Sequence, residues 1–146
     1  MRKASEQVGV LGAVSPAEIA VGTADTEWTD ASLWNGFMGV VQAGALGVAA
    51  TLDASIRQAT DDAGASAKAV TGASIVQLES GAGNDMLAVI NCDANELDRD
   101  NGFTFVSLRL TVGTDNSFAS GVLYGVGPRY GPASDSDSDI VDSISN

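Results

Sequence analysis

Residues 99–133 read RDNGFTFVSLRLTVGTDNSFASGVLYGVGPRYGPA, and this stretch decides the fold class. From Val106 to Val112, apolar side chains alternate with Ser107, Arg109 and Thr111, a period of two that is typical of a half-buried strand. Gly-Thr-Asp-Asn at 113–116 has turn chemistry, and a second apolar run follows at 118–126. We therefore predict an antiparallel β-hairpin. It ends at the hook 127–132, whose two prolines cannot donate to a sheet ladder.

A second alternating stretch precedes it. Every even-numbered position from 46 to 56 carries an apolar side chain: Leu46, Val48, Ala50, Leu52, Ala54 and Ile56. Such alternation over eleven positions predicts a strand, because a helical period would scatter these residues around an axis. Shorter strands are predicted at 8–14, where Ser15 and Pro16 break the run, at 75–78 and at 86–92.

Strands separated by turn signals, with no long helical period and no internal repeat, predict an all-β protein. We expect an antiparallel β-sandwich, jelly-roll-like in its connections. The predicted organisation is a flexible N-terminal arm at 1–7, one sandwich domain at 8–133 and an acidic C-terminal tail at 134–146.

Composition narrows the range of functions. The chain has 146 residues, 17 of them glycine, and only 5% aromatic residues. Small side chains predict either a thin sandwich or close contacts with neighbouring subunits. A net charge of −12 argues against binding to nucleic acid and against docking on an anionic membrane surface. No apolar run is long enough to predict a transmembrane helix.

The sequence predicts no catalytic residue, no cofactor and no metal site. Histidine is absent, which removes Ser-His-Asp and Cys-His pairs and the common zinc ligand sets. Residues 81–87 match a calcium-binding nonapeptide, but that site needs stacked copies. The loop at 93–104 lacks the glycine and glutamate of an EF-hand. Cys92, in an apolar run, is expected to be buried. A hydrolase with paired carboxylates stays open, although no acids mark a pocket.

Three segments together resemble a family of small tailed-phage proteins whose genes tend to lie among head genes. They are the strand at 50–58 with its turn ATDDAG, the segment NGFTFVSLRLTVG at 101–113, and VLYGVGPRYGPA at 122–133. The resemblance covers about residues 46–133. Many members have glycine directly after the acid pair of the turn, where this chain has Ala63 before Gly64.

This resemblance implies a non-enzymatic virion structural protein, most simply a capsid decoration (cement) protein on the capsid exterior. Its expected partners are the major capsid protein and further copies of itself, for which a trimer is the simplest arrangement. The alternative is a tail-tube or neck component. A third alternative is a module that binds carbohydrate or a host surface, with Trp28 and Trp34 as an exposed platform instead of caps on the core.

Two segments are candidate interfaces. The hook offers Pro128, Arg129 and Tyr130, a rigid turn with residue types that are enriched at interfaces. It can equally be a strand end packed on its own domain. The tail carries an isolated apolar motif of Ile140, Val141 and Ile144, which is either solvated with its acidic surroundings or an anchor for a neighbouring subunit.

Overall fold

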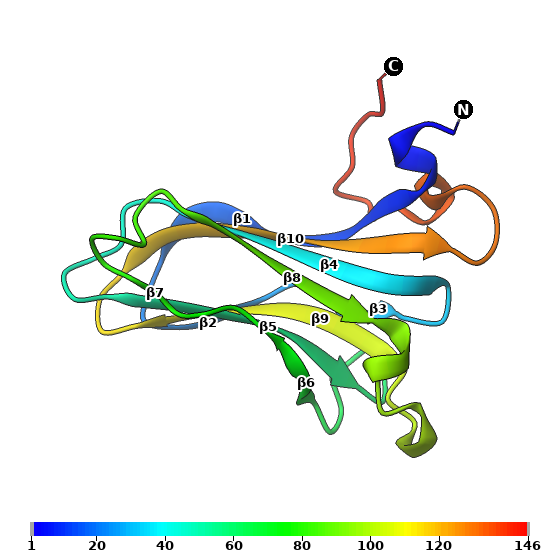
Figure 1. Cartoon of the computed structure of the whole chain (residues 1–146), viewed down its shortest axis with the longest axis horizontal. Coiled ribbons are helices and arrows are strands. Elements are labelled where there is room, and N and C mark those ends of the chain that lie inside the picture. The colour runs from blue at the N-terminus through cyan, green and yellow to red at the C-terminus, as the bar shows by residue number, and fades with distance from the viewer. Residues whose placement is uncertain (1, 146) are drawn as a thin grey trace.

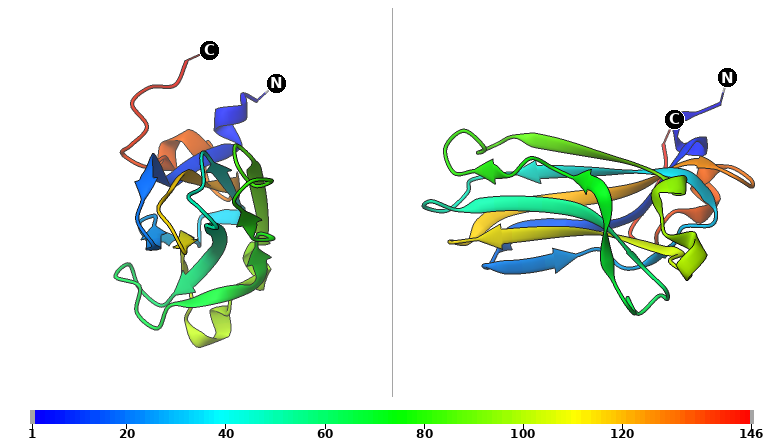
Figure 2. Two further views of the ribbon diagram at one scale, coloured as in Figure 1. Left: turned by 90° about the vertical axis from the view of Figure 1, so that its left-hand side faces the viewer. Right: turned by 60° about the horizontal axis from the view of Figure 1, so that its bottom comes forward.

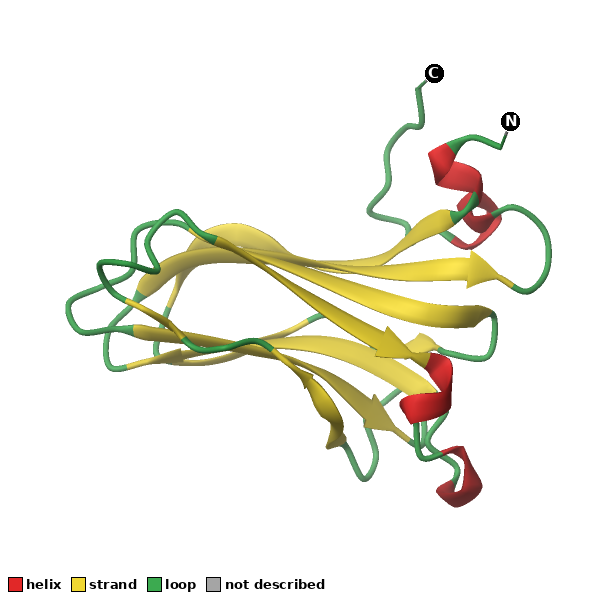
Figure 3. Cartoon of the chain, viewed as in Figure 1, coloured by secondary structure: helices red, strands yellow, loops and turns green. Residues whose placement is uncertain are grey.

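The computed structural model describes residues 2–145 and consists of two antiparallel sheets packed face to face (Figure 1). Sheet I has the strand order β1 (Val8–Ile19), β10 (Ser117–Pro128), β4 (Trp34–Ala43) and β8 (Leu87–Asp93). Sheet II has the order β2 (Gly22–Asp25), β9 (Phe105–Gly113), β5 (Thr51–Ala59) and β6 (Lys68–Ser74), with β3 (Thr29–Asp30) beside β9 and β7 (Leu78–Glu79) beside β5. Within the described residues, the helical segments are short 3-10 turns at Ala4–Glu6, Ala94–Glu96, Arg99–Asn101 and Ala133–Ser136 (Figure 3).

The connections make this sandwich a jelly roll. The chain moves between the two sheets at most of its connections, so strands that follow one another in sequence usually face each other across the core. First and last strands, β1 and β10, lie side by side in sheet I. The predicted all-β, antiparallel, jelly-roll-like sandwich is therefore confirmed.

The predicted hairpin of residues 106–112 and 118–126 is wrong, although both of its strands exist. β9 pairs with β5, β2 and β3 in sheet II, whereas β10 pairs with β1 and β4 in sheet I. The turn at 113–116 therefore arches over the edge of the core instead of joining two hydrogen-bonded neighbours. Local turn chemistry is the same in both cases, and the pairing of five other strands with the edges of β9 and β10 decides between them.

Other strand boundaries also differ from prediction. The predicted strand at 75–78 is wrong, because residues 75–77 connect β6, which ends at Ser74, to the two-residue strand β7. β5 begins at Thr51, because Ala49 has a left-handed φ of 56° and Val48 is 82% exposed in the preceding turn. β1 does not stop at Ser15 and Pro16 but continues to Ile19, with an irregularity in register between Val14 and Ala17. An edge strand tolerates proline at such an irregularity, since no ladder bond is lost there.

The core explains the many small residues. Trp34 is completely buried between the sheets, and a Cβ at Gly9 or Gly125 would collide with its ring. Gly121 likewise leaves room for Leu108 of the opposite sheet. The glycines of sheet I thus leave room for large neighbours, both Trp34 of its own strand β4 and Leu108 of sheet II. This is the thin sandwich that the composition predicts.

Both termini lie at one end of the molecule, beside sheet I (Figure 1). The predicted acidic tail is bound to the domain along its first residues: the Val10 N–H donates to Asp137 Oδ1 at 2.7 Å, and the Ser138 N–H donates to the Val10 carbonyl at 2.7 Å. Ala133 is fully buried. Met1 of the predicted arm and Asn146 of the predicted tail lie outside the described residues.

Candidate interaction surface

The outward side of sheet I is apolar. Alternation sends every second side chain of its strands away from the core, and these side chains are mostly large and hydrophobic. We call this set the apolar face: Val10, Ala13, Met38, Val40, Leu87, Val89, Phe118, Val122, Tyr124 and Val126. Strand pairing joins it into rows, one of which runs through Ala13, Val122, Val40 and Val89 across all four strands.

Charge is nearly absent from this sheet. Its strands contain only Glu18 and Asp93 as charged residues, both near strand ends. Leu87, Val89 and Phe118 are each at least half exposed. A contiguous exposed apolar patch of this kind marks an interaction surface more often than an ordinary protein exterior.

The outward side of sheet II is polar. It presents hydroxyl and charged side chains, including those of Thr51, Asp53, Ser55, Arg57, Arg109 and Thr111. Arg109 donates to both carboxylate oxygens of Asp25, at 2.6 and 2.8 Å, and this hydrogen bonding raises the pKa of its guanidinium above the ordinary value. Such a face is stable in water without a partner.

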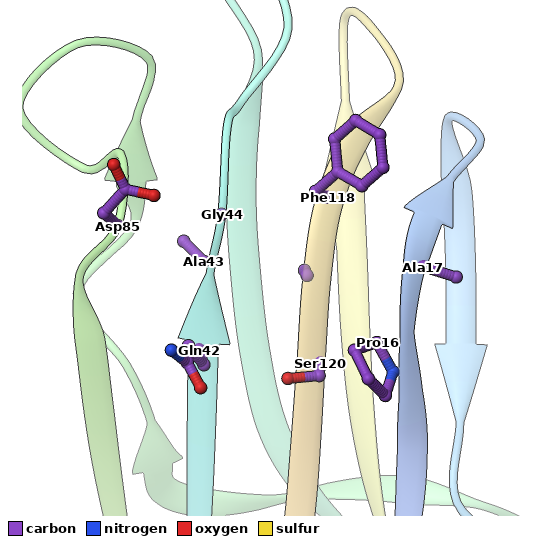
Figure 4. A pocket seen from close by; sticks show the side chains of 9 residues that line it. Pro16, Ala17, Gln42, Ala43, Gly44, Asp85, Phe118 and Ser120 are labelled. Carbon is purple, nitrogen blue, oxygen red and sulfur yellow. The ribbon is translucent and has the colours of Figure 1, made fainter.

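A groove of about 370 Å³ lies at one end of the apolar face (Figure 4). The Phe118 ring stands on β10 beside it, with Pro16 of β1 and Gln42 of β4 on the two flanking strands. Ser120 lies directly opposite Gln42 in the ladder, and Asp85, held at a left-handed φ of 59°, closes the rim. The groove could receive a partner's side chain next to the flat rows of the face.

The described residues offer little reactive chemistry elsewhere. They contain no cluster of three or more His, Cys, Asp or Glu side chains placed to hold a metal ion. Burial raises the pKa of the Cys92 thiol to about 12, with Glu96 adding to the effect, so the predicted buried cysteine is confirmed. Hydrogen bonds from Lys68 and Asn101 lower the pKa of Asp98, which is on the surface. None of the described helical turns is long and apolar enough to cross a membrane.

The hook residues are placed at the end of sheet I. Pro128 is the last residue of β10 and pairs with Trp34. Arg129 is tied to its own domain, since its backbone N–H donates to the Leu33 carbonyl at 2.8 Å and its Nε to the Trp34 carbonyl at 3.4 Å. Tyr130 is 79% exposed and therefore remains the accessible part of the predicted interface.

The three tail residues lie close to their own chain. Ile140 borders a hollow beside Leu11 and Gly12 of β1, and Ile144 lies beside the N-terminal 3-10 turn. Both are more than half exposed, and Val141 is half-buried. The hook and the tail lie near the end of sheet I at which the termini meet, and their role as an interface remains a prediction.

An exposed tryptophan platform is not present. Trp34 lies in the core, and Trp28 is half-buried with its indole against Gly64. The carbohydrate-binding alternative therefore loses the residues on which it depended.

The apolar face was not among the predicted sites, yet the sequence carries a signal for it. In β10, glycine and alanine hold the inward parity at 119, 121 and 125, while Phe118, Val122 and Tyr124 hold the outward one. β4 and β8 are also apolar on both parities. A strand with large apolar residues on both sides is normally covered on both sides.

Comparisons with known proteins leave the family open. No protein-family model matches the sequence, and no curated protein matches it. Three solved structures of infectious bursal disease virus match this chain weakly. The Gt strain structure is 15% identical with a TM-score of 0.47, and the match covers 88% of this chain and 33% of that one. The Gx strain structure is 13% identical with a TM-score of 0.41, with coverage of 89% and 34%. The VP2 subviral particle is 17% identical with a TM-score of 0.41, with coverage of 87% and 31%.

This chain therefore spans about one third of the length of those chains. At these TM-scores the likeness assigns neither a family nor a function.

Proposed function

We propose that this chain is a non-enzymatic structural protein of a virion, and that it decorates a capsid by docking the apolar face of sheet I onto the major capsid protein. The observation that carries the proposal is the apolar face itself. Large side chains on a sheet that needs none of them for its own core imply a second layer, and a capsid lattice supplies one. The resemblance to small tailed-phage proteins whose genes tend to lie among head genes supports the choice of a capsid as that second layer.

The contrast between the two outward sides supports one orientation. With the apolar face of sheet I against the shell, the polar side of sheet II faces outward, away from the DNA inside. Jelly rolls occur in viral capsids, but they also occur in lectins and cupins, so the fold by itself selects no function. Stabilisation would arise by mass action, because many copies bind the assembled shell and not its unassembled subunits.

The test uses the purified protein and DNA-free capsids of the virus that encodes it. Co-sedimentation should show saturable binding, and the capsids should resist higher temperature or chaotrope when they are covered. Absence of binding at about 100 μM protein, a concentration at which even weak interfaces are occupied, would contradict the proposal. Stacked rings or tubes that form without capsids, seen by negative-stain microscopy, would favour the tail-tube or neck alternative instead.

A further inference from the structure

Among the described strands, three of the four sheet edges are protected. β1 is covered by the C-terminal segment, through the bonds between Val10 and residues Asp137 and Ser138. β2 has only four residues. β6 is interrupted by Gly72, whose φ is 81°, and its register against β5 is irregular. Short, covered or irregular edges are the usual means by which proteins prevent sheet-to-sheet pairing.

β8 is the fourth edge, and it is regular along seven residues. The Ala43 N–H donates to the Met86 carbonyl at 2.9 Å, which makes these two residues a hydrogen-bonded pair of the β4–β8 ladder. Hydrogen-bonded pairs recur at every second residue of an antiparallel ladder. The residues of β8 that bond to β4 are therefore Ala88, Ile90 and Cys92.

The backbone groups of Leu87, Val89 and Asn91 point the other way, toward the open side of β8. No described residue outside sheet I hydrogen-bonds to them. Figure 2 shows β8 at the margin of the sandwich with no strand beyond it. The open stretch ends at Asp93, whose N–H donates to Glu96 Oε2 at 2.7 Å. Three consecutive outward N–H and C=O pairs are thus ready to bond to another strand.

Between Asp85 and Asp93, the side chains of this edge do nothing to repel a second strand. Residues 86–92 carry no charge, in a chain whose net charge is −12. Edge strands that stay unpaired usually carry lysine or another charge. A basic partner, which the protein as a whole would attract, finds no carboxylate along this segment. An uncharged segment fits it better, and residues 86–92 are themselves such a segment.

We propose that β8 pairs with β8 of a second copy of this chain, antiparallel about a two-fold axis, to form a dimer with a continuous eight-stranded sheet. Centred on Val89, the pairing brings the outward groups of Leu87, Val89 and Asn91 opposite the same groups of the other copy. The row of Val40 and Val89 then continues into the second copy, so the two apolar faces become one surface. This dimer replaces the trimer expected from the sequence, and it does not depend on the proposed binding to capsids.

The first measurement needs no variant. Hydrogen exchange of the full-length protein is followed at several concentrations, without capsids, in about 0.15 M salt or more to screen the net charge. We expect amides 87, 89 and 91 to be protected at high concentration and to lose protection on dilution, while amides 88, 90 and 92 stay protected throughout. Rapid exchange of the first set at about 1 mM protein would overturn the proposal.

A pair of variants then distinguishes backbone hydrogen bonding through β8 from non-specific hydrophobic association. Val89→Pro removes an N–H that bonds to nothing within the monomer, so the variant should fold, as shown by its circular dichroism, yet sediment as a monomer. Val89→Thr keeps that N–H and a β-branched side chain, and should still dimerise within about threefold of the original affinity. A folded proline variant with undiminished dimerisation, or a trimeric mass for the unaltered protein, would contradict pairing through β8. Binding to capsids is measured separately, so failure of either proposal is recognised independently.

Discussion

The two outward sides of this sandwich differ in the side chains that they expose: those of sheet II are polar and those of sheet I are mostly apolar. On sheet II, alternation separates apolar residues inside from polar residues outside: Leu108 and Leu110 are fully buried, and Arg109 between them reaches solvent and bonds to Asp25. On sheet I this separation is lost in β10, where Gly121 and Gly125 face the core beside Leu123 while Val122 and Tyr124 face outward. The pattern of sheet II is sufficient for a domain that is stable in water on its own. The pattern of sheet I leaves hydrophobic side chains on the outside, where they stabilise the isolated domain little, and this indicates a binding partner.

The largest effect is expected at the centre of the apolar face. Val122→Lys should weaken binding to capsids at least about 100-fold, because an ammonium group would be buried without a counter-charge, and 100-fold corresponds to about 2.8 kcal/mol. Thr111→Lys, at the centre of the polar face, is the matched control and should leave binding within about twofold. The comparison between the faces fails if both lysines weaken binding equally. Co-sedimentation with DNA-free capsids measures both.

A change inside the sandwich should destabilise the protein itself. Gly125→Ala would place a methyl group against the buried Trp34 ring, and overpacking of this kind costs about 1–3 kcal/mol. Urea unfolding should show the loss as a lower midpoint. Ser120→Ala, on the outward parity of the same strand, should change the free energy of unfolding by less than about 0.5 kcal/mol. Equal stability of the two variants would mean that β10 does not support the core through its glycines.

On the sheet II side, a small buried network closes the gap between β2 and β3. Thr26 Oγ1 accepts from the Leu108 N–H at 2.9 Å, and Ser107 Oγ donates to the Thr26 carbonyl at 2.8 Å. Thr26→Val keeps the shape and removes the acceptor, which leaves a buried N–H unsatisfied and should cost about 1–3 kcal/mol of unfolding free energy. Thr26→Ser retains the hydroxyl and should recover most of that loss. A fully stable valine variant would contradict this role.

The smallest effect belongs to the surface of sheet II. Arg109→Gln breaks a partly exposed ion pair with Asp25 and should lower stability by about 0.2–1 kcal/mol, less at high salt. Binding to capsids should not change. Thermal unfolding at two salt concentrations measures the first expectation. A salt-independent loss of several kcal/mol would show that the polar face is held together by more than exposed charges.

Local pattern predicted the strands better than their partners. The inward set at 106–112 is correct because burial follows directly from a period of two. The hairpin at 113–116 is wrong because a short turn can join neighbours in one sheet or cross between two, and only the remaining strands decide which. Val48 belongs to the alternating apolar set but lies in the turn before β5, where alternation in the sequence does not determine which side chains are buried.

The sequence did not predict the apolar face of sheet I, for a related reason. The sequence predicts interface residues at the hook, including Tyr130, and in the acidic tail, both toward the C-terminal end of the chain. A sheet face cannot be recognised before the strand order is known, since Val40, Val89 and Val122 come from three distant segments. What could be read in advance was that β4, β8 and β10 are apolar on both parities, a pattern that requires cover on both sides.

The most direct test of the central claim is a cryo-electron microscopy map of DNA-free capsids incubated with this protein. The account predicts that the outward side of sheet I lies against the shell, with Val122 and Val40 out of solvent and Arg109 of sheet II pointing away. A map in which sheet II faces the shell, or in which the apolar face stays open to solvent on bound protein, would contradict it.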